Sequence, residues 1–401
     1  MQHIVTMLPV LIDKTAIFIE KMDAIARSGA ITELDSYCVN LTFDIICQVI
    51  TNVDVHAQEE GLTHELIASF RLLLDTYISG TGLGLAALNP YIQLKRYRYS
   101  RRMDAALFKI IKEKFENIQQ SRNTEDKTSS KDRSVLALAL RDVEILTPDV
   151  SQLIADQCKT FLFAGHDTTS ILLQRLFYAL SIDPPRLAKI REEHDSLFGP
   201  EDPQTVFLAK PDEILKGLPY TSACIKEALR LWPPAATARM THDDFRIRTK
   251  EGDDVLVDKC VIYPMQHLIH RDPDVYGPTA NDFVPERWIG DSDTSAATNA
   301  DMSGTSTPTG NIPASAWRPF ERGPRNCIGQ ELANLEARVI LACVMRRYDF
   351  VKVGVGEVDT DDTGKPMVDE SGRYKTKSEL ISTMSVTSKP IDKTRMIVRL
   401  R

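Results

Sequence analysis

The sequence has 401 residues, of which 43% are hydrophobic and 26% are charged, and its formal net charge at pH 7 is −7. This composition is typical of a globular protein and allows one large domain or two to three ordinary ones. The negative total gives a nucleic-acid partner no electrostatic support. The sequence contains no unbroken run of the roughly eighteen apolar residues that a membrane span needs.

Seven cysteines are spread along the chain without a CxxC pair. That spacing argues against a disulfide framework and against a structural zinc site. We therefore expect the chain as given to be soluble, cytoplasmic and reduced. Most of these thiols have apolar neighbours and are predicted to be small buried core residues; Cys327 is the exception.

Helical periodicity covers most of the chain. It indicates helices over residues 5–28, 35–53, 62–80, 98–121, 147–181, 184–196, 219–231 and 327–347. Strand-like alternation is confined to the short pieces Asp244–Arg248, Val255–Val257 and Arg395–Leu400. The predicted fold class is therefore mainly α with small β-sheets.

Two polar stretches interrupt this pattern, at about residues 119–134 and 290–315. Their Ser, Thr and Asp content predicts flexible surface loops. Neither stretch separates blocks of different composition, so a single domain over residues 1–401 is favoured.

One predicted helix is unusually long. Thr147, Pro148 and Asp149 form a helix start, with a capping hydroxyl, a proline in the first turn and an acid near the positive end of the dipole. The helical pattern continues to about Ile182, and some 35 residues at about 1.5 Å each give roughly 50 Å. We expect this helix to cross the whole domain as its central helix.

The apolar stripe of this helix has two members that are poor core residues. The stripe is Ile154, Cys158, Phe161, Gly165, Thr168, Leu172 and Leu176. Gly165 costs about 1 kcal/mol in a helix interior, and Thr168 is poorer than leucine in propensity and burial. Two interpretations stay open. One is a packing notch for a crossing helix, with Thr168 bonded to the carbonyl one turn earlier. The other is a gap over a cofactor, where Asp167 and Thr168 relay protons.

The segment 317–329, WRPFERGPRNCIG, carries the exceptional cysteine, and a helix is predicted to begin at Cys327. Gly323 and Gly329 permit a tight turn and close approach of a flat group. Free N–H groups and the helix dipole at Cys327 favour a thiolate with a lowered pKa. Three basic residues add positive potential: Arg318, Arg322 and Arg325.

A thiolate in such a loop suits either a nucleophile or a metal ligand. A nucleophile usually has a paired histidine, and the nearest in sequence, His270, lies far upstream. One thiolate is too few ligands for zinc or an iron–sulfur cluster. Haem needs only one protein ligand, so haem is the best fit to a lone cysteine.

The run FERGPRNCIG, residues 320–329, resembles the haem-binding signature of the cytochrome P-450 family, F-x-x-G-x-R-x-C-x-G, at every fixed position. The resemblance implies that fold, with haem b as the cofactor and Cys327 as the axial ligand to the iron. It also implies Arg325 on a haem propionate, Phe320 packed beside the sulfur, and Gly323 and Gly329 shaping the haem-binding loop.

Further family elements follow in the expected order. Residues 164–169, AGHDTT, resemble the oxygen-activation motif, which implies catalytic roles for Asp167 and Thr168. Arg239 resembles the family's second arginine partner of a haem propionate. An arginine with no such role, in an ordinary strand, would explain this position nearly as well.

A structural network is also implied. Glu227 and Arg230 resemble the family's E-x-x-R pair, and Arg287, in the sequence PERW, resembles the arginine that joins it. These three residues are expected to form a buried network that clamps the cysteine loop. Their implied role is structural and not catalytic.

The resemblance implies a monooxygenase that places one oxygen atom from O₂ into a hydrophobic small molecule, using electrons from an NADPH-cytochrome reductase. Arg318 and Arg322 are a candidate docking face for an acidic reductase, or a solvated face. The remaining pocket positions are residues 161–168, 235–238 and 384–387. The sequence around the cysteine is most similar to that of filamentous-fungal members of the family, and this similarity implies a role in fungal secondary metabolism.

Two other functions stay open. One is a haem-thiolate isomerase or dehydratase that acts on a peroxide, although this chemistry needs neither Asp167 nor Thr168. The other is a truncated, haem-poor and non-catalytic product. Family members normally carry a W-x-x-x-R propionate contact that is absent here before residue 30, so we expect an N-terminally incomplete fold. The resemblance implies that full-length forms associate with the cytosolic face of the endoplasmic reticulum membrane.

Overall fold

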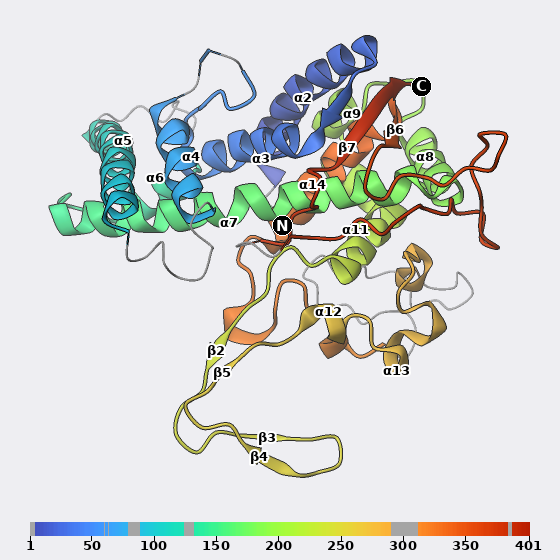
Figure 1. Ribbon diagram of the computed structural model, residues 1–401. Helices are drawn as coiled ribbons and strands as arrows, with labels where there is room; N and C mark the ends of the chain where they lie inside the picture. The colour runs from blue at the N-terminus through green and yellow to red at the C-terminus, as the bar shows by residue number, and fades with distance from the viewer. Residues whose placement is uncertain are drawn as a thin grey trace.

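The computed structural model describes residues 5–59, 61–62, 64–78, 89–123, 132–289, 312–383 and 387–401. Helices dominate these residues, and three small antiparallel sheets lie at their margins (Figure 1). The predicted fold class, mainly α with small sheets, is confirmed. None of the described helices is both long and apolar enough to cross a membrane.

The predicted helices are present, with shifted ends. The long ones are α2 (Leu8–Ser28), α3 (Leu34–Thr51), α4 (Glu65–Ile78), α5 (Pro90–Asn123), α7 (Pro148–Ser181), α8 (Pro184–Phe198), α11 (Pro219–Leu231) and α14 (Gln330–Val344). Short helices that the periodicity did not reveal are α6 (Val135–Leu140), α9 (Pro203–Ala209), α10 (Pro211–Lys216), α12 (Gln266–Ile269) and α13 (Pro273–Tyr276).

The predicted central helix is α7, which crosses the molecule with α5 near its amino-terminal end and α8 near its carboxyl-terminal end (Figure 1). Thr147 caps it as expected, because its Oγ1 accepts a hydrogen bond from the Val150 amide at 3.3 Å and Pro148 occupies the first turn.

Two hydrophobic cores meet along α7. The first joins its carboxyl-terminal half to α2, α3, α11 and α14, and the second joins its amino-terminal half to α3, α4, α5 and α6. At its two ends the predicted stripe is buried as expected, at Ile154, Cys158, Leu172 and Leu176. In the middle the prediction of burial is wrong, because Phe161, Gly165 and Thr168 are only half-buried.

The largest sheet has three strands in the order β1 (Ile31–Glu33), β7 (Arg395–Leu400), β6 (Tyr348–Lys352), with Ile31 opposite Ile397 and Tyr348 opposite Leu400. The predicted strand 395–400 is therefore confirmed. β2 (Arg239–Met240) pairs with β5 (Val261–Ile262), and β3 (Arg246–Arg248) pairs with β4 (Asp254–Leu256) in a hairpin that projects from the helical body (Figure 1).

Two boundaries are corrected. The helix expected at 98–121 begins at Pro90 and continues to Asn123, so the first residues of the loop predicted at 119–134 are helical, and 124–131 lie outside the described residues. Of the loop predicted at 290–315, residues 290–311 lie outside the described residues, and Ala314–Ala316 form a helical turn, η4.

Residues 380–382 and 387–394 lie against α7 and bind its polar side chains. Arg175 donates to the Leu380 carbonyl and to Ser382 Oγ, both at 2.6 Å. Thr394 Oγ1 donates to the amide oxygen of Gln174 at 2.9 Å. Arg175 and Gln174 are fully buried. The hydrogen bonds from these residues therefore satisfy side-chain groups of α7 that would otherwise be buried without partners.

Candidate active site

The cysteine loop closes on itself through backbone hydrogen bonds. The Cys327 amide donates to the Phe320 carbonyl at 2.8 Å, and the Asn326 amide donates to the Gly323 carbonyl at 3.0 Å. Gly323 has φ +80°, a left-handed conformation that glycine adopts without strain, as predicted for this turn. Gly329 has φ −84° and needs no such freedom; a Cβ there would lie 3.8 Å from Cys327 Sγ.

Cys327 precedes α14 instead of lying within it, because Gly329 is the N-cap and the helix begins at Gln330. The expected N–H donors are present: the Gly329 and Gln330 amides donate to the sulfur and lower its pKa. Burial of the sulfur has the larger effect, however, and the net pKa of the Cys327 thiol is raised. This direction is opposite to the lowered pKa that we expected from the N–H groups and the helix dipole alone.

Glu321 organises the start of the loop. Its carboxylate accepts hydrogen bonds from Thr237 Oγ1 at 2.8 Å, Gln266 Nε2 at 2.7 Å and Arg318 Nη2 at 2.7 Å. Burial raises the pKa of Glu321, but the hydrogen bonds from Arg318 and Thr237 outweigh it and the pKa is lowered. Arg239 contributes to this lowering, so the predicted second propionate partner lies close to the cysteine loop. Our sequence reasoning missed Glu321, which occupies a variable position of the signature.

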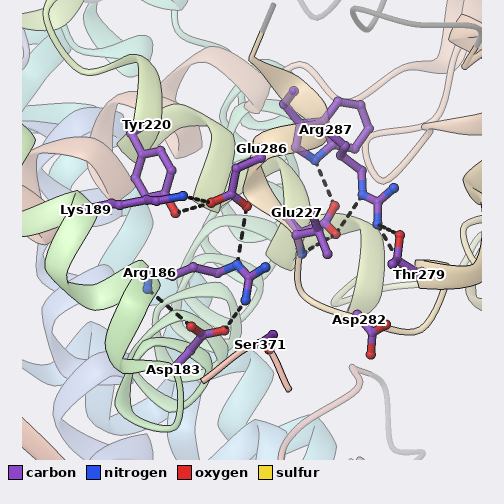
Figure 2. A network of polar contacts seen from close by, with 12 residues as sticks. Asp183, Arg186, Lys189, Tyr220, Glu227, Thr279, Asp282, Glu286, Arg287 and Ser371 are labelled. Carbon is purple, nitrogen blue, oxygen red and sulfur yellow. Dashed lines mark hydrogen bonds and ion pairs between the residues drawn. The ribbon is translucent and has the colours of Figure 1, made fainter. Parts of the chain in front are cut away.

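The predicted Glu227–Arg230–Arg287 network is present. Arg230 binds Glu227 through two hydrogen bonds of 2.8 Å, and Arg287 Nε donates to Glu227 Oε1 at 3.0 Å. Figure 2 shows Arg287 between Glu227 and Thr279, and shows a second cluster in which Arg186, Lys189 and Tyr220 converge on Glu286. Glu227 and Arg230 are fully buried, so Arg230 depends on Glu227 for its counter-charge, whereas Glu227 is paired with both Arg230 and Arg287.

This network reaches the cysteine loop through His270. The His270 ring bonds the Arg230 carbonyl through Nδ1 at 3.0 Å and accepts from the Arg318 amide through Nε2 at 3.0 Å. Burial lowers the pKa of His270 to about 4, so the ring is neutral and can accept at one nitrogen while it donates at the other. Trp317 adds a hydrogen bond from Nε1 to the Lys226 carbonyl at 3.1 Å. These contacts support the expected clamp on the loop.

The notch on α7 fits the packing interpretation, and the proton-relay interpretation stays a prediction. A Cβ at Gly165 would lie 2.5 Å from Ile46 Cγ1, so Gly165 permits close packing of α3 on α7. Thr168 Oγ1 donates to the Ala164 carbonyl at 2.9 Å, as the packing interpretation expected. Ala164 is nevertheless exposed, so this face of α7 borders an open space near the middle of the helix.

Asp167 has different partners from Thr168. Its carboxylate is buried, forms an ion pair with Lys389 at 2.6 Å and accepts a hydrogen bond from Thr387. Within the described residues no hydrogen bond joins Asp167 to Thr168. Of the pocket positions predicted at 384–387, only Thr387 lies within the described residues, and it contributes this bond.

The arrangement fits a large flat group held by one sulfur. Cys327 and Arg325 are exposed, and the apolar side chain of Ile328 is 86% exposed beside them. Leu332, in the first turn of α14, packs against the core to which α7 contributes Cys158 and Leu162. The cysteine loop thus presents an exposed cysteine residue, an exposed cation and an exposed apolar side chain, which suits a porphyrin with acidic propionates.

Comparison with known proteins agrees with this geometry. A family model described as Cytochrome P450 matches residues 1–377. The chain belongs to the cytochrome P450 family of haem-thiolate oxidoreductases. The expected family resemblance is thereby confirmed.

The relatives include fungal members. The chain is 34% identical over 360 residues to Cytochrome P450 monooxygenase acrF of Aspergillus aculeatus, covering 87% of this chain and 69% of the relative. It is 30% identical over 364 residues to Cytochrome P450 monooxygenase polC of Polytolypa hystricis, covering 87% of this chain and 60% of the relative. A cytokinin hydroxylase of Arabidopsis thaliana is 31% identical over 264 residues, covering 63% of this chain and 45% of the relative.

Proposed function

We propose that the protein is a haem-dependent monooxygenase that transfers one oxygen atom from O₂ to a hydrophobic small molecule in fungal secondary metabolism. The observation that carries this proposal is the cysteine loop, where backbone amides point at the sulfur of Cys327 and the signature matches the family at every fixed position. The electrons would come from an NADPH-cytochrome reductase.

Four side chains would hold haem b. Cys327 would ligate the iron, Phe320 would pack beside the sulfur, and Arg325 and Arg239 would neutralise the propionates. Both arginines are exposed, and neither forms an ion pair with an acidic side chain of the described residues. When bound, haem supplies the redox chemistry of O₂, which no protein side chain provides.

Asp167 and Thr168 would supply protons on the open face of α7. The Thr168 hydroxyl is held in place by its bond to the Ala164 carbonyl. The Asp167 carboxylate is held by Lys389, whose side chain is half-buried and so connects the buried acid toward solvent. A proton would pass from this pair to the reacting centre while the surrounding cores exclude bulk water.

The reductase would meet the loop on its exposed side. Of the two cations expected on this face, Arg318 is paired with Glu321 at 2.7 Å, which leaves Arg322 as the exposed cation for a reductase. An acidic patch on a reductase would be steered to this face, and the association would weaken as ionic strength rises.

The experiment that tests the proposal is a CO difference spectrum of the reduced protein purified with haem. We expect the shifted Soret band of a thiolate-ligated haem in the unsubstituted chain. Cys327→Ser should abolish this band. Cys260→Ser, at the other exposed cysteine, is the matched control and should retain it. A shifted band that persists in Cys327→Ser would refute the assignment of the ligand.

A further inference from the structure

A cavity of 270 Å³ lies between α3, α4, α7 and the residues Thr383, Thr387 and Lys389. Its walls are mostly apolar, with Phe43, Phe70, Leu74 and Phe163 among them. The Phe43 and Phe70 rings pack at 5.1 Å, and the buried His166 ring meets Phe70 edge-on at 4.9 Å. The volume is just below the roughly 300–1,000 Å³ of sites for drug-sized ligands, so the cavity suits a small apolar molecule.

The charged side chains around this cavity differ in whether they have a counter-charge. Lys389 and Asp167 neutralise each other at 2.6 Å, and burial lowers the pKa of His166, which keeps that ring neutral. Asp75 is exposed and has an interaction of its own.

Arg71 differs from all of these. Its Nη2 donates to the amide oxygen of Asn40 at 2.5 Å, and no acidic side chain of the described part of the chain lies within 4.0 Å of its guanidinium. The carboxylate that favours its charged form, Asp44, already accepts bonds from the Ala57 and Gln58 amides.

A half-buried guanidinium beside aromatic walls pays a desolvation cost that a neutral amide only partly offsets. A carboxylate matches the planar fork of arginine and can form two charge-assisted hydrogen bonds with it. From this juxtaposition we infer that the cavity binds a small amphipathic carboxylic acid, whose carboxylate pairs with Arg71 and whose apolar body lies against Phe43, Phe70 and Phe163.

The inference rests on the proposed function only in treating this cavity as part of the substrate site, because Phe163 and Asp167 of α7 line it together. It names the substrate class that the monooxygenase would accept. Arg71 is then a specificity-determining residue and takes no part in the chemistry.

The test is calorimetric titration of the purified chain with decanoate, methyl decanoate and decanol, which share one apolar tail. We expect decanoate to bind about ten- to a hundredfold more tightly than the two neutral compounds, the range for a hydrogen bond to a charged group. This comparison needs no substitution, so a variant that fails to fold cannot obscure it. Equal affinity for all three compounds would overturn the inference.

Substitution then assigns the preference to one residue. Arg71→Gln should remove the selectivity for decanoate and leave the affinity for decanol unchanged. Arg101→Gln removes the same charge from an exposed position of the neighbouring α5 and should change neither. Retained selectivity in Arg71→Gln would refute the role of Arg71. Because binding heat does not depend on a CO band, selective binding without that band would disprove the proposed function and leave this inference intact.

Discussion

Thr168 and Thr160 offer a direct comparison of one side-chain hydroxyl in two places. Thr160 Oγ1 donates to the Asp156 carbonyl and Thr168 Oγ1 donates to the Ala164 carbonyl, each at 2.9 Å and each across one turn of α7. The two residues therefore contribute alike to the helix. They differ in position, since only Thr168 follows the buried Asp167 in the motif assigned to oxygen activation.

Replacing Thr168 by alanine should leave haem binding intact and divert the reducing electrons from product to hydrogen peroxide, because a proton donor is lost on the open face of α7. The measurement is the ratio of peroxide and product formed to NADPH consumed, in the presence of a reductase. Thr160→Ala should keep the ratio of the unsubstituted protein. Undiminished coupling in Thr168→Ala would exclude the relay.

At the scale of elements, the contact between α3 and α7 depends on the missing side chain at Gly165. A Cβ at this position would crowd three atoms of the Ile46 side chain, at 2.5, 2.6 and 3.2 Å. Alanine would gain about 1 kcal/mol in helix propensity, yet the two helices would have to separate to admit it. Steric overlap is the larger effect here, because neighbouring side chains of both cores fix the position of α3.

We expect Gly165→Ala to lower the free energy of unfolding by about 1–3 kcal/mol, measured by urea denaturation. In an Ile46→Ala background the same change should cost less or should stabilise, because the overlapping atoms are gone. Equal cost in both backgrounds would show that the overlap with Ile46 is not the cause.

For the whole molecule, three buried histidines with a lowered pKa make stability depend on pH: His166, His194 and His270. Burial lowers the pKa of His194 to about 3 and that of His270 to about 4, whereas unfolded histidine has a pKa of about 6.5. Below pH 6.5 the unfolded chain therefore binds protons that the folded chain does not, and stability falls as pH falls. The loss continues down to the folded pKa of each ring.

Between pH 7 and pH 5 we expect His194 and His270 each to reduce the free energy of unfolding by about 2 kcal/mol. Urea denaturation at the two pH values measures the difference. His194→Gln has no titrating ring and should show a smaller difference than the unsubstituted protein. If the variant and the unsubstituted protein show the same pH dependence, His194 is not protonated on unfolding in this range.

The features that could be predicted from sequence are those with local causes. The Thr147 cap and the apolar period of α7 involve neighbours in the chain, and so does the turn at Gly323. The first eight residues of α5, 90–97, escaped prediction because the basic run KRYRYSRR, residues 95–102, obscures the helical period there. Strands as short as β2 carry no alternation to detect.

The site could be predicted only where its residues are close together in the sequence. The cysteine loop lies within one short stretch, so its residues were found together. The partners of Asp167 were not, because Thr387 is 220 residues away and only the folded chain brings it to α7. Glu321 was missed because its three hydrogen-bond donors come from separate segments.

The attachment of Leu380, Lys389 and Thr394 to α7 has a consequence for how the protein is made. On the ribosome, Arg175, Gln174 and Asp167 emerge long before Leu380, Thr394 and Lys389. Until those late residues are translated, the nascent helix carries ionic and amide groups that it cannot bury without loss of hydration. The central helix therefore reaches its final packing only after synthesis has passed residue 394.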